Sequence, residues 1–265
     1  TVGRAVFRAS ASIVKYTTTM PVSDSSEMQR IYEEQLGTPS TVIPYCWTDL
    51  PCESDPDATL GALGLEAGRY LLTAGRLVPE NQADVIGGAY AASDADIPLV
   101  VVGEANYDSP VSHRLQELVD GGANVRLIGH VHERATYRTL VEHARAVVHG
   151  HTVGGINPAL IEAMGSAAAI IAYDTPFNRQ ALGTAGAYFS FPEDLRSKLD
   201  EVASDPHWGR QHRAEASRRA QRVFSLASVA DAYEQVLMTA AAVGPCGTAA
   251  MASIWLDPIG AGERS

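Results

Sequence analysis

The segment from His149 to Met164 reads HGHTVGGINPALIEAM and combines a glycine-rich turn with the start of a helix. Asn157 and Pro158 are residue types that cap a helix and occupy its first turn. Gly154 and Gly155 let the backbone approach a ligand closely, and a helix N-terminus offers unpaired N–H groups with partial positive charge. The pattern predicts an anion site suited to a diphosphate. A plain turn between a strand and a helix is the alternative reading.

Glu162 lies one helical turn beyond Pro158. A carboxylate at that place can accept hydrogen bonds from ribose hydroxyls while phosphates bind at the turn. The segment therefore predicts a site for a nucleoside diphosphate. A solvated glutamate on a helix surface is the other interpretation.

Two further polar segments follow apolar runs that are predicted to be buried strands. Gly75 and Arg76 follow the run that ends at residue 74, and the segment Asp174–Gln180 follows the run that ends at residue 173. In an open parallel sheet, ligands bind at the carboxyl ends of the strands. An arginine there suits a bidentate contact with a diphosphate, although a surface arginine or a routine polar loop would give the same pattern.

The chain from about residue 70 alternates short apolar runs with helix-like stretches, which predicts βα units around a parallel sheet. Strands are predicted at 70–74, 97–102, 125–128, 146–149, 168–173 and 188–191. Helices are predicted at 79–92, 110–119, 135–144 and 157–165, and again from 193 to 242 with breaks at Pro206 and Gly209. Ahead of this region, a strand at 21–24, a helix at 27–36 and a strand at 41–44 precede an acidic, proline-containing linker.

Composition limits the classes of protein that fit. The chain has 265 residues, of which 46% are hydrophobic, and a formal net charge of -11, which disfavours nucleic acid as a partner. Three cysteines without CxxC spacing indicate a reduced, cytoplasmic protein. No apolar run is long enough for a membrane span. The histidine pairs at 130/132 and 149/151 lack a third ligand at a diagnostic spacing, so no metal site is expected.

In combination, the segments GRLVPEN, VVGE, NVRLIGHV, HGHTVGGINPALIEAM and AYDTPFNRQ resemble the donor domain of glycosyltransferase family 4. The most similar branch is the bacterial rhamnosyltransferase-like group, whose members read PEN after the Gly-Arg pair and GGxNP before EAM. The resemblance covers residues 10–237. It implies an α/β GT-B fold with two facing Rossmann-like domains, retention of the anomeric configuration, and a chemical step without metal or other cofactor.

The resemblance also implies roles for individual residues. Arg76 would neutralise the leaving diphosphate and Glu162 would hold the ribose, and these two form the candidate catalytic set. The candidate donor-binding residues are Gly75, Arg76, Asn81, His151, Gly154, Gly155, Ile156, Asn157, Glu162 and Arg179. The implied donor is a UDP-, dTDP- or GDP-sugar, and the implied acceptor is a saccharide or a lipid-linked saccharide.

Several positions depart from the family pattern. Many members carry two glutamates eight positions apart, and Gly154 stands at the first of these, where the rhamnosyltransferase-like branch also has glycine. Asn81 stands where many members have a lysine. The usual glycine and proline after EAM are Ala167 and Ala169. Gln180 replaces the glutamate of FNRE. These changes remove charge contacts and weaken the expectation of tight donor binding.

The resemblance further divides the chain into a remnant of an acceptor domain at 1–48, a linker at 49–68, a donor-binding domain with C-terminal helices at 69–242, and a disordered tail at 243–265. Because the chain begins at Thr1 and roughly 100 residues of an acceptor domain would be missing, we expect a truncated retaining glycosyltransferase. The alternatives are a non-catalytic nucleotide-sugar-binding subunit, an inactive fragment, or a nucleotide-sugar epimerase. The arginine-rich stretch 210–222 predicts a solvated helix face or a peripheral contact with the inner, anionic face of a membrane.

Overall fold

The computed structural model describes residues 10, 13, 20–49, 51–105 and 107–243. The chain forms two compact units. The smaller unit combines Thr1–Cys46 with Arg222–Ser265, and the larger one is Trp47–Gln221. The predicted donor domain, 69–242, therefore starts later and ends later than the larger unit.

The larger unit contains a six-stranded sheet in which every neighbouring pair of strands is parallel. Its strand order is β5-β4-β3-β6-β7-β8. The strands are β3 (Leu71–Ala74), β4 (Leu99–Val102), β5 (Val125–Gly129), β6 (Ala146–His149), β7 (Ile170–Tyr173) and β8 (Ala187–Phe189). The predicted α/β parallel sheet is confirmed, although several strands are shorter than the apolar runs suggested.

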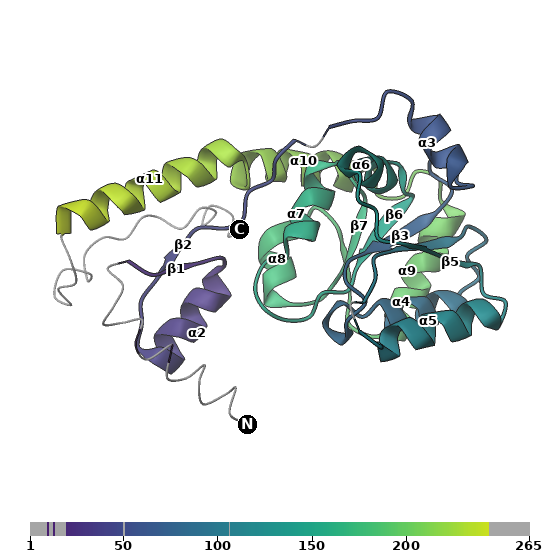
Figure 1. Ribbon diagram of the computed structural model, residues 1–265, viewed down its shortest axis with the longest axis horizontal. Coiled ribbons are helices and arrows are strands. Elements are labelled where there is room, and N and C mark those ends of the chain that lie inside the picture. The colour runs from purple at the N-terminus through teal and green to yellow at the C-terminus, as the bar shows by residue number, and fades with distance from the viewer. Residues whose placement is uncertain (1–9, 11–12, 14–19, 50, 106, 244–265) are drawn as a thin grey trace. The chain divides into compact units, whose positions relative to one another are not determined.

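Helices cover both faces of this sheet (Figure 1). Helices α4 (Ala83–Ala91), α5 (Pro110–Asp120) and α9 (Pro192–Ser204) pack together, and so do α3 (Pro56–Ala62) with α6 (Arg134–His143) and α7 (Pro158–Gly165) with α8 (Pro176–Leu182). Helix α10 (Arg210–Val223) ends the unit. Five of these helices begin at a proline, whose fixed φ suits the first turn and whose missing N–H would be unpaired there anyway.

Apolar residues of the central strands form the core between the helix layers. All four residues of β4 and of β6 are buried. Strands buried on both faces are typical of a parallel sheet covered by helices, and they explain why the strands appear in the sequence as continuous apolar runs.

The structure differs from the sequence prediction at four places. The helix predicted at 79–92 is interrupted, because a 3-10 turn, η1 (Pro79–Asn81), is separated from α4 by Gln82 at φ 53°. Helix α8 stands where we expected a polar loop, and the predicted linker 49–68 contains α3. The helical stretch after residue 193 has a further break between α10 and α11 (Leu226–Val243).

The expected solvated face of the arginine-rich stretch is wrong for two of its arginines. Arg213 donates to the carbonyl oxygens of Glu142 and Ala167 at 3.1 Å each, and also to that of Ala144. Arg219 donates to two carbonyl oxygens at the end of α8, at 2.6 and 2.7 Å. These side chains attach α10 to the larger unit by satisfying the terminal carbonyls of neighbouring elements.

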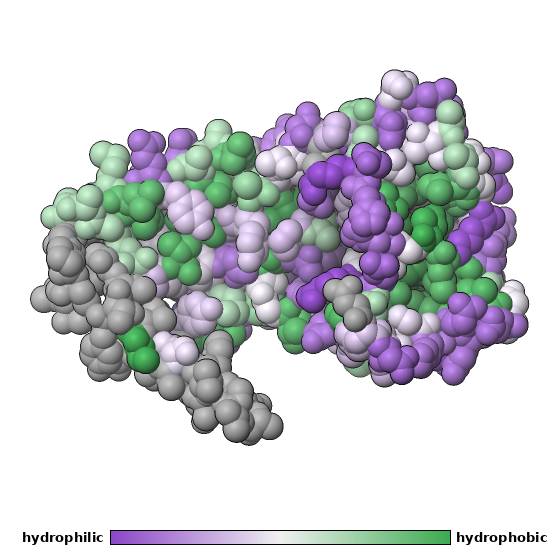
Figure 2. Space-filling model, in the orientation of Figure 1, coloured by the Kyte–Doolittle hydropathy of each residue, from purple (hydrophilic) through white to green (hydrophobic). Residues whose placement is uncertain are grey.

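The smaller unit contains two short parallel strands, β1 (Val22–Ser23) and β2 (Thr41–Val42), joined by α2 (Ser26–Leu36). This confirms the strand, helix and strand expected there. Val229 and Val236 of α11 are buried with Ile43 in a small apolar cluster. Other apolar side chains of α11, such as Leu237, remain exposed, and apolar residues lie at the surface along this helix in Figure 2. The predicted tail lies outside the described residues beyond Val243.

Within the described part of the chain, no helix is both long and apolar enough to cross a membrane. The same residues contain no group of three or more His, Cys, Asp or Glu side chains that could hold a metal ion.

Candidate functional site

Three loops meet at the carboxyl edge of the sheet, after the neighbouring strands β3, β6 and β7. Asn81 Oδ1 lies 2.9 Å from His151 Nδ1, which joins the first loop to the second. The N–H of Thr152 donates to the carbonyl oxygen of Glu80 at 2.9 Å and reinforces that connection. Asn178 Nδ2 donates to the carbonyl oxygen of His151 at 2.9 Å and adds the third loop. We call these contacts the loop network.

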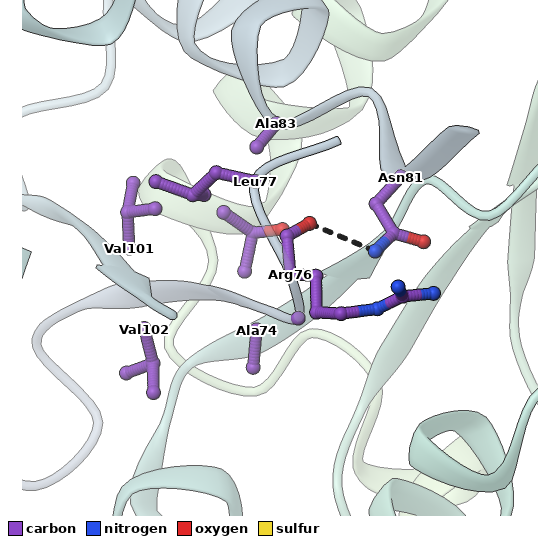
Figure 3. Close-up of a pocket in the computed structure, with 9 residues that line it drawn as sticks. Ala74, Arg76, Leu77, Asn81, Ala83, Val101 and Val102 are labelled. Atoms are coloured by element: carbon purple, nitrogen blue, oxygen red, sulfur yellow. Dashed lines mark hydrogen bonds between the residues drawn. The ribbon is translucent and has the colours of Figure 1, made fainter. Parts of the chain in front are cut away.

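The loop after β3 carries Arg76 and is held by Asn81. Asn81 Nδ2 donates to the carbonyl oxygen of Arg76 at 2.9 Å. Gly75, at φ 151°, turns the chain out of the strand. In Figure 3 the Arg76 guanidinium and the Asn81 amide extend to the same side, away from Val101 and Val102. Arg76 is exposed, and none of the ion pairs among the described residues involves it. Its charge is therefore available to an anion.

The two histidines around Gly150 are held in the neutral form. Burial lowers the pKa of His149 to about 3, with a smaller contribution from His151. Burial also lowers the pKa of His151 and outweighs the backbone of Val153 and the negative charge of Glu80, which raise it; the positive charge of Arg76 lowers it slightly further. Because the Asn81 amide nitrogen donates to Arg76, its oxygen is the acceptor, so His151 donates from Nδ1. In the neutral ring the proton is therefore on Nδ1, and Nε2 is an acceptor.

The loop after β6 approaches the first loop so closely that only glycine fits at residue 150. A Cβ there would overlap the carbonyl oxygen of Asn81 and lie 3.0 Å from Ile86 Cδ1. Gly154 and Gly155 have φ values of 93° and 95°, which L side chains rarely adopt. Ile156 is buried and anchors the end of the turn.

Helix α7 begins directly after this turn. The Asn157 side chain caps it by accepting from the N–H of Ala159 at 2.9 Å. Pro158 has no N–H, and the N–H groups of Leu160 and Ile161 donate to the carbonyl oxygen of Asn157. The helix therefore offers a ligand its positive end at this sheet edge, and not free N–H groups of its first turn. The anion site predicted from the sequence therefore has the expected strand, glycine turn and helix.

Glu162 lies one turn along α7 and contacts α6. Its Oε1 is 2.9 Å from Arg134 Nη2. Burial raises the pKa of Tyr137 above its ordinary value, and the negative charge of Glu162 adds to that rise. Arg134 was missed by the sequence analysis because it lies 28 positions from Glu162. An arginine in the first turn of a helix, where its charge opposes the macrodipole, was the available signal.

Arg179, which was expected to bind the donor, instead contacts two neighbouring residues of the same part of the fold, Asp174 and Tyr188. Its guanidinium makes two hydrogen bonds to the Asp174 carboxylate, at 2.5 and 2.6 Å. It also lies 4.4 Å from the centre of the Tyr188 ring. The residue that reaches the loop network is the preceding Asn178, which is fully buried and also donates to the carbonyl oxygen of Tyr173 at 2.8 Å. The sequence signal for Asn178 was its place in the polar segment after β7.

Three buried side-chain atoms at this edge have no hydrogen-bond partner among the described residues: Gln82 Oε1, His149 Nε2 and Asn178 Oδ1. Buried polar atoms are nearly always paired, so unpaired ones call for an explanation. Residues 82, 149 and 178 stand in or directly beside the three loops. The site therefore combines a free guanidinium, a capped helix N-terminus and a carboxylate, which together suit a nucleoside diphosphate.

Comparison with known proteins agrees with this chemistry. The family described as glycosyl transferases group 1 matches residues 62–223. Because this match covers more than half of the sequence, the chain belongs to that family and is a glycosyltransferase. No curated protein sequence matches the chain.

Solved structures show the same fold at low sequence identity. The Anabaena protein HepE in complex with UDP-glucose is 16% identical with a TM-score of 0.77, and the match covers 89% of this chain and 68% of HepE. A sucrose-phosphate synthase from Thermosynechococcus elongatus is 18% identical with a TM-score of 0.75, over 91% of this chain and 63% of that one. A glycosyltransferase from Rickettsia africae is 12% identical with a TM-score of 0.76, over 89% and 67%. These likenesses establish the GT-B fold.

Proposed function

We propose that this chain binds a nucleoside diphosphate sugar at the carboxyl edge of β3, β6 and β7 and transfers the sugar with retention of its anomeric configuration. The observation that carries the proposal is the hydrogen bond between Asn81 and His151, which holds the loop of Arg76 against the glycine-rich turn. HepE, whose fold this chain shares, has been solved with UDP, with UDP and glucose, and with UDP-glucose. Residues 10–237 also resemble glycosyltransferase family 4, and its rhamnosyltransferase-like branch in particular.

In this proposal the diphosphate is bound by the backbone N–H groups near Gly155 and Asn157, at the positive end of α7, and by Arg76. As the bond between the sugar and the diphosphate breaks, negative charge develops on the leaving diphosphate. A guanidinium and the positive end of a helix stabilise that charge where it forms. They supply the positive charge that a divalent metal supplies elsewhere, so we propose that the reaction needs no metal. Glu162 accepts a hydrogen bond from the ribose.

The acceptor is proposed to be a saccharide or a lipid-linked saccharide, and the reaction to take place in the cytoplasm. Contact with an anionic membrane surface would depend on the exposed arginines of α10, which are Arg210, Arg218 and Arg222. Arg213 and Arg219 bind carbonyl groups of the larger unit. Flotation with anionic and with neutral vesicles tests that contact. Binding to both vesicle types, or to neither, contradicts it.

Calorimetric titration with UDP, dTDP and GDP tests the donor site. We expect binding of at least one nucleotide, and a roughly tenfold weaker affinity in Arg76→Ala because a charge-assisted contact is worth about 1.5–3 kcal/mol and Arg76 is exposed. Arg69→Ala is the matched control, since Arg69 is also exposed and its closest ion-pair contact is 3.9 Å. No heat with any nucleotide would reject the proposal.

A non-catalytic nucleotide-sugar-binding subunit is the second candidate, because Gly154 replaces the first of the two glutamates that many members of glycosyltransferase family 4 carry. Incubation with sugar nucleotides, followed by measurement of released nucleoside diphosphate, separates the two. Release that depends on Arg76 and continues in the presence of a chelator supports a metal-independent enzyme. Binding without any release supports the subunit.

A further inference from the structure

The carboxylate assigned to the ribose is already bound by a side chain of this protein. Arg134 Nη2 lies 2.9 Å from Glu162 Oε1. The Arg134 side chain is 59% exposed, whereas that of Glu162 is 26% exposed, so the contact lies at the edge of the site and not in open solvent. Among the described residues, no hydrogen bond or ion pair joins Oε2 of Glu162 to another side chain.

Helix stability does not explain the position of Arg134. It is the first residue of α6, where the positive end of the helix macrodipole disfavours a cation. Glu133, directly before it, makes no capping hydrogen bond from its side chain. The favourable contact of Arg134 is therefore the one with Glu162. Because α6 follows β5, its first turn lies at the sheet edge where the ligand is proposed to bind.

This contact changes what Glu162 requires from a donor. A ribose offers two neighbouring hydroxyl groups, and a carboxylate with two unbound oxygens can accept from both. A 2′-deoxyribose offers only the 3′-hydroxyl. A site discriminates strongly against the analogue that lacks a hydroxyl when the loss leaves a polar group of the protein unpaired. Here Arg134 already supplies a partner to one oxygen, so one hydroxyl is enough to satisfy the other.

We propose that Arg134 takes the place of the ribose 2′-hydroxyl as a partner of Glu162, so that the site accepts 2′-deoxyribonucleoside diphosphates about as well as ribonucleoside diphosphates. The inference rests on the proposed function, because it assumes that Glu162 faces the ribose. It goes beyond that function by stating which sugar of the nucleotide the site tolerates. Arg134 is a positioning residue in this account, since it acts through Glu162.

Calorimetric titration of the protein with UDP and with 2′-deoxy-UDP tests the inference. The quantity of interest is the ratio of the two Kd values, because a general loss of structure would weaken both ligands and leave the ratio unchanged. In the wild-type protein, we expect the two Kd values to differ by less than about fivefold. In Arg134→Ala, the preference for UDP over 2′-deoxy-UDP should increase by about fivefold or more. This lies at the low end of the cost of leaving a polar group unpaired, because Glu162 is partly exposed.

Two variants complete the experiment. Arg134→Lys keeps a cationic donor and should retain most of the wild-type ratio. Arg114→Ala is the matched control, because the Arg114 side chain is also 59% exposed and also binds a glutamate, Glu117, at 2.8 Å. It should leave both Kd values unchanged. A wild-type preference for UDP of about fivefold or more, or an unchanged ratio in Arg134→Ala, overturns the inference. If neither uridine nucleotide binds but GDP does, the same ratio is measured with GDP and 2′-deoxy-GDP. Absence of binding by all of UDP, dTDP and GDP rejects the donor site itself, and the inference with it.

Discussion

Asn81 Oδ1 and His151 Nδ1 lie 2.9 Å apart and join the loops that follow two neighbouring strands of the sheet. The same Asn81 side chain binds the carbonyl oxygen of Arg76 through its nitrogen. One amide therefore fixes the backbone of the proposed diphosphate-binding arginine and the position of the glycine-rich turn. Many members of glycosyltransferase family 4, which this chain resembles, have a lysine at this position, so here a hydrogen bond between loops stands where those proteins have a positive charge.

Replacing Asn81 tests this function of the amide. In Asn81→Ala both hydrogen bonds are lost, and we expect UDP to bind about tenfold more weakly, since two neutral hydrogen bonds contribute roughly 1–3 kcal/mol. Asn81→Asp should reduce binding further, because a carboxylate beside the diphosphate repels it. Calorimetric titration measures both effects. Gln116→Ala removes an exposed amide hydrogen bond to Asp120 on α5 and is the control. Unaltered affinity in Asn81→Ala would show that the loops are positioned without this residue.

The close approach of the two loops leads to a stability prediction at Gly150. In Gly150→Ala the added Cβ overlaps the backbone of Asn81, so one of the loops must shift. We expect a loss of about 1–3 kcal/mol in the free energy of unfolding, as is typical of overpacking. Gly88→Ala is the opposite case. Gly88 lies within α4, and a Cβ added there would have no atom within 4 Å. This substitution should stabilise the protein by about 0.5–1 kcal/mol. Urea unfolding of both variants checks the pair, and a similar stability of the two would be contrary to this structure.

The parallel sheet and the glycine-rich turn could be predicted from the sequence because their signals are local. Buried strands such as β4 and β6 are short apolar runs, and the start of α7 is marked by Asn157 and Pro158. Helix α8 was missed although Thr175 and Pro176 mark its start, because its seven residues are too few to show a helical period.

Other features depend on how separate elements pack, and the sequence has no local signal for them. Gln82 interrupts the helix predicted at 79–92 without a glycine or proline to mark the break. The contact between Arg134 and Glu162 requires the relative position of α6 and α7. Likewise, Arg179 was expected to bind the donor, and only the structure shows its bidentate contact with Asp174.

Ala167 adopts a backbone conformation that favours glycine. Its φ is 52°, in the left-handed region, at the position where the family usually has glycine. The left-handed conformation destabilises the folded state by about 1–2 kcal/mol for an L residue. Replacement by glycine removes this strain, but part of the gain is lost because glycine has a higher conformational entropy in the unfolded chain. We therefore expect Ala167→Gly to increase the free energy of unfolding by about 0.5–1 kcal/mol. The measurement is the shift in the urea midpoint.

Ala214→Gly serves as the comparison for that variant. Ala214 is exposed within α10, in an ordinary helical position. Glycine there should lower the stability by about 0.5–1 kcal/mol. The same exchange of residue types is thus expected to have opposite signs at the two sites. A decrease in stability at both positions would mean that the backbone at Ala167 is not strained.

The buried His149 predicts that stability depends on pH in a definite direction. Burial lowers its pKa to about 3 in the folded protein, whereas in the unfolded chain it is about 6.5. Between these values the unfolded state binds more protons than the folded state, so stability rises with pH. The contribution of His149 is fully present above pH 6.5 and is lost progressively as the pH falls toward 3. The loss amounts to about 1.4 kcal/mol for each pH unit in that window.

His149→Gln removes this titration while keeping a polar side chain. Urea unfolding at pH 7.5, 6.5 and 5.5 should show a steep loss of stability in the wild-type protein and a shallower one in the variant, by about 1 kcal/mol between pH 6.5 and 5.5. The slope is compared, and not the absolute stability, because the substitution itself perturbs the core. His113→Gln is the control, since His113 is 65% exposed. Equal slopes for the wild type and His149→Gln would mean that His149 takes up a proton in the folded protein as readily as in the unfolded chain. That result would contradict the neutral state that we assign to His149 beside the proposed phosphate-binding turn.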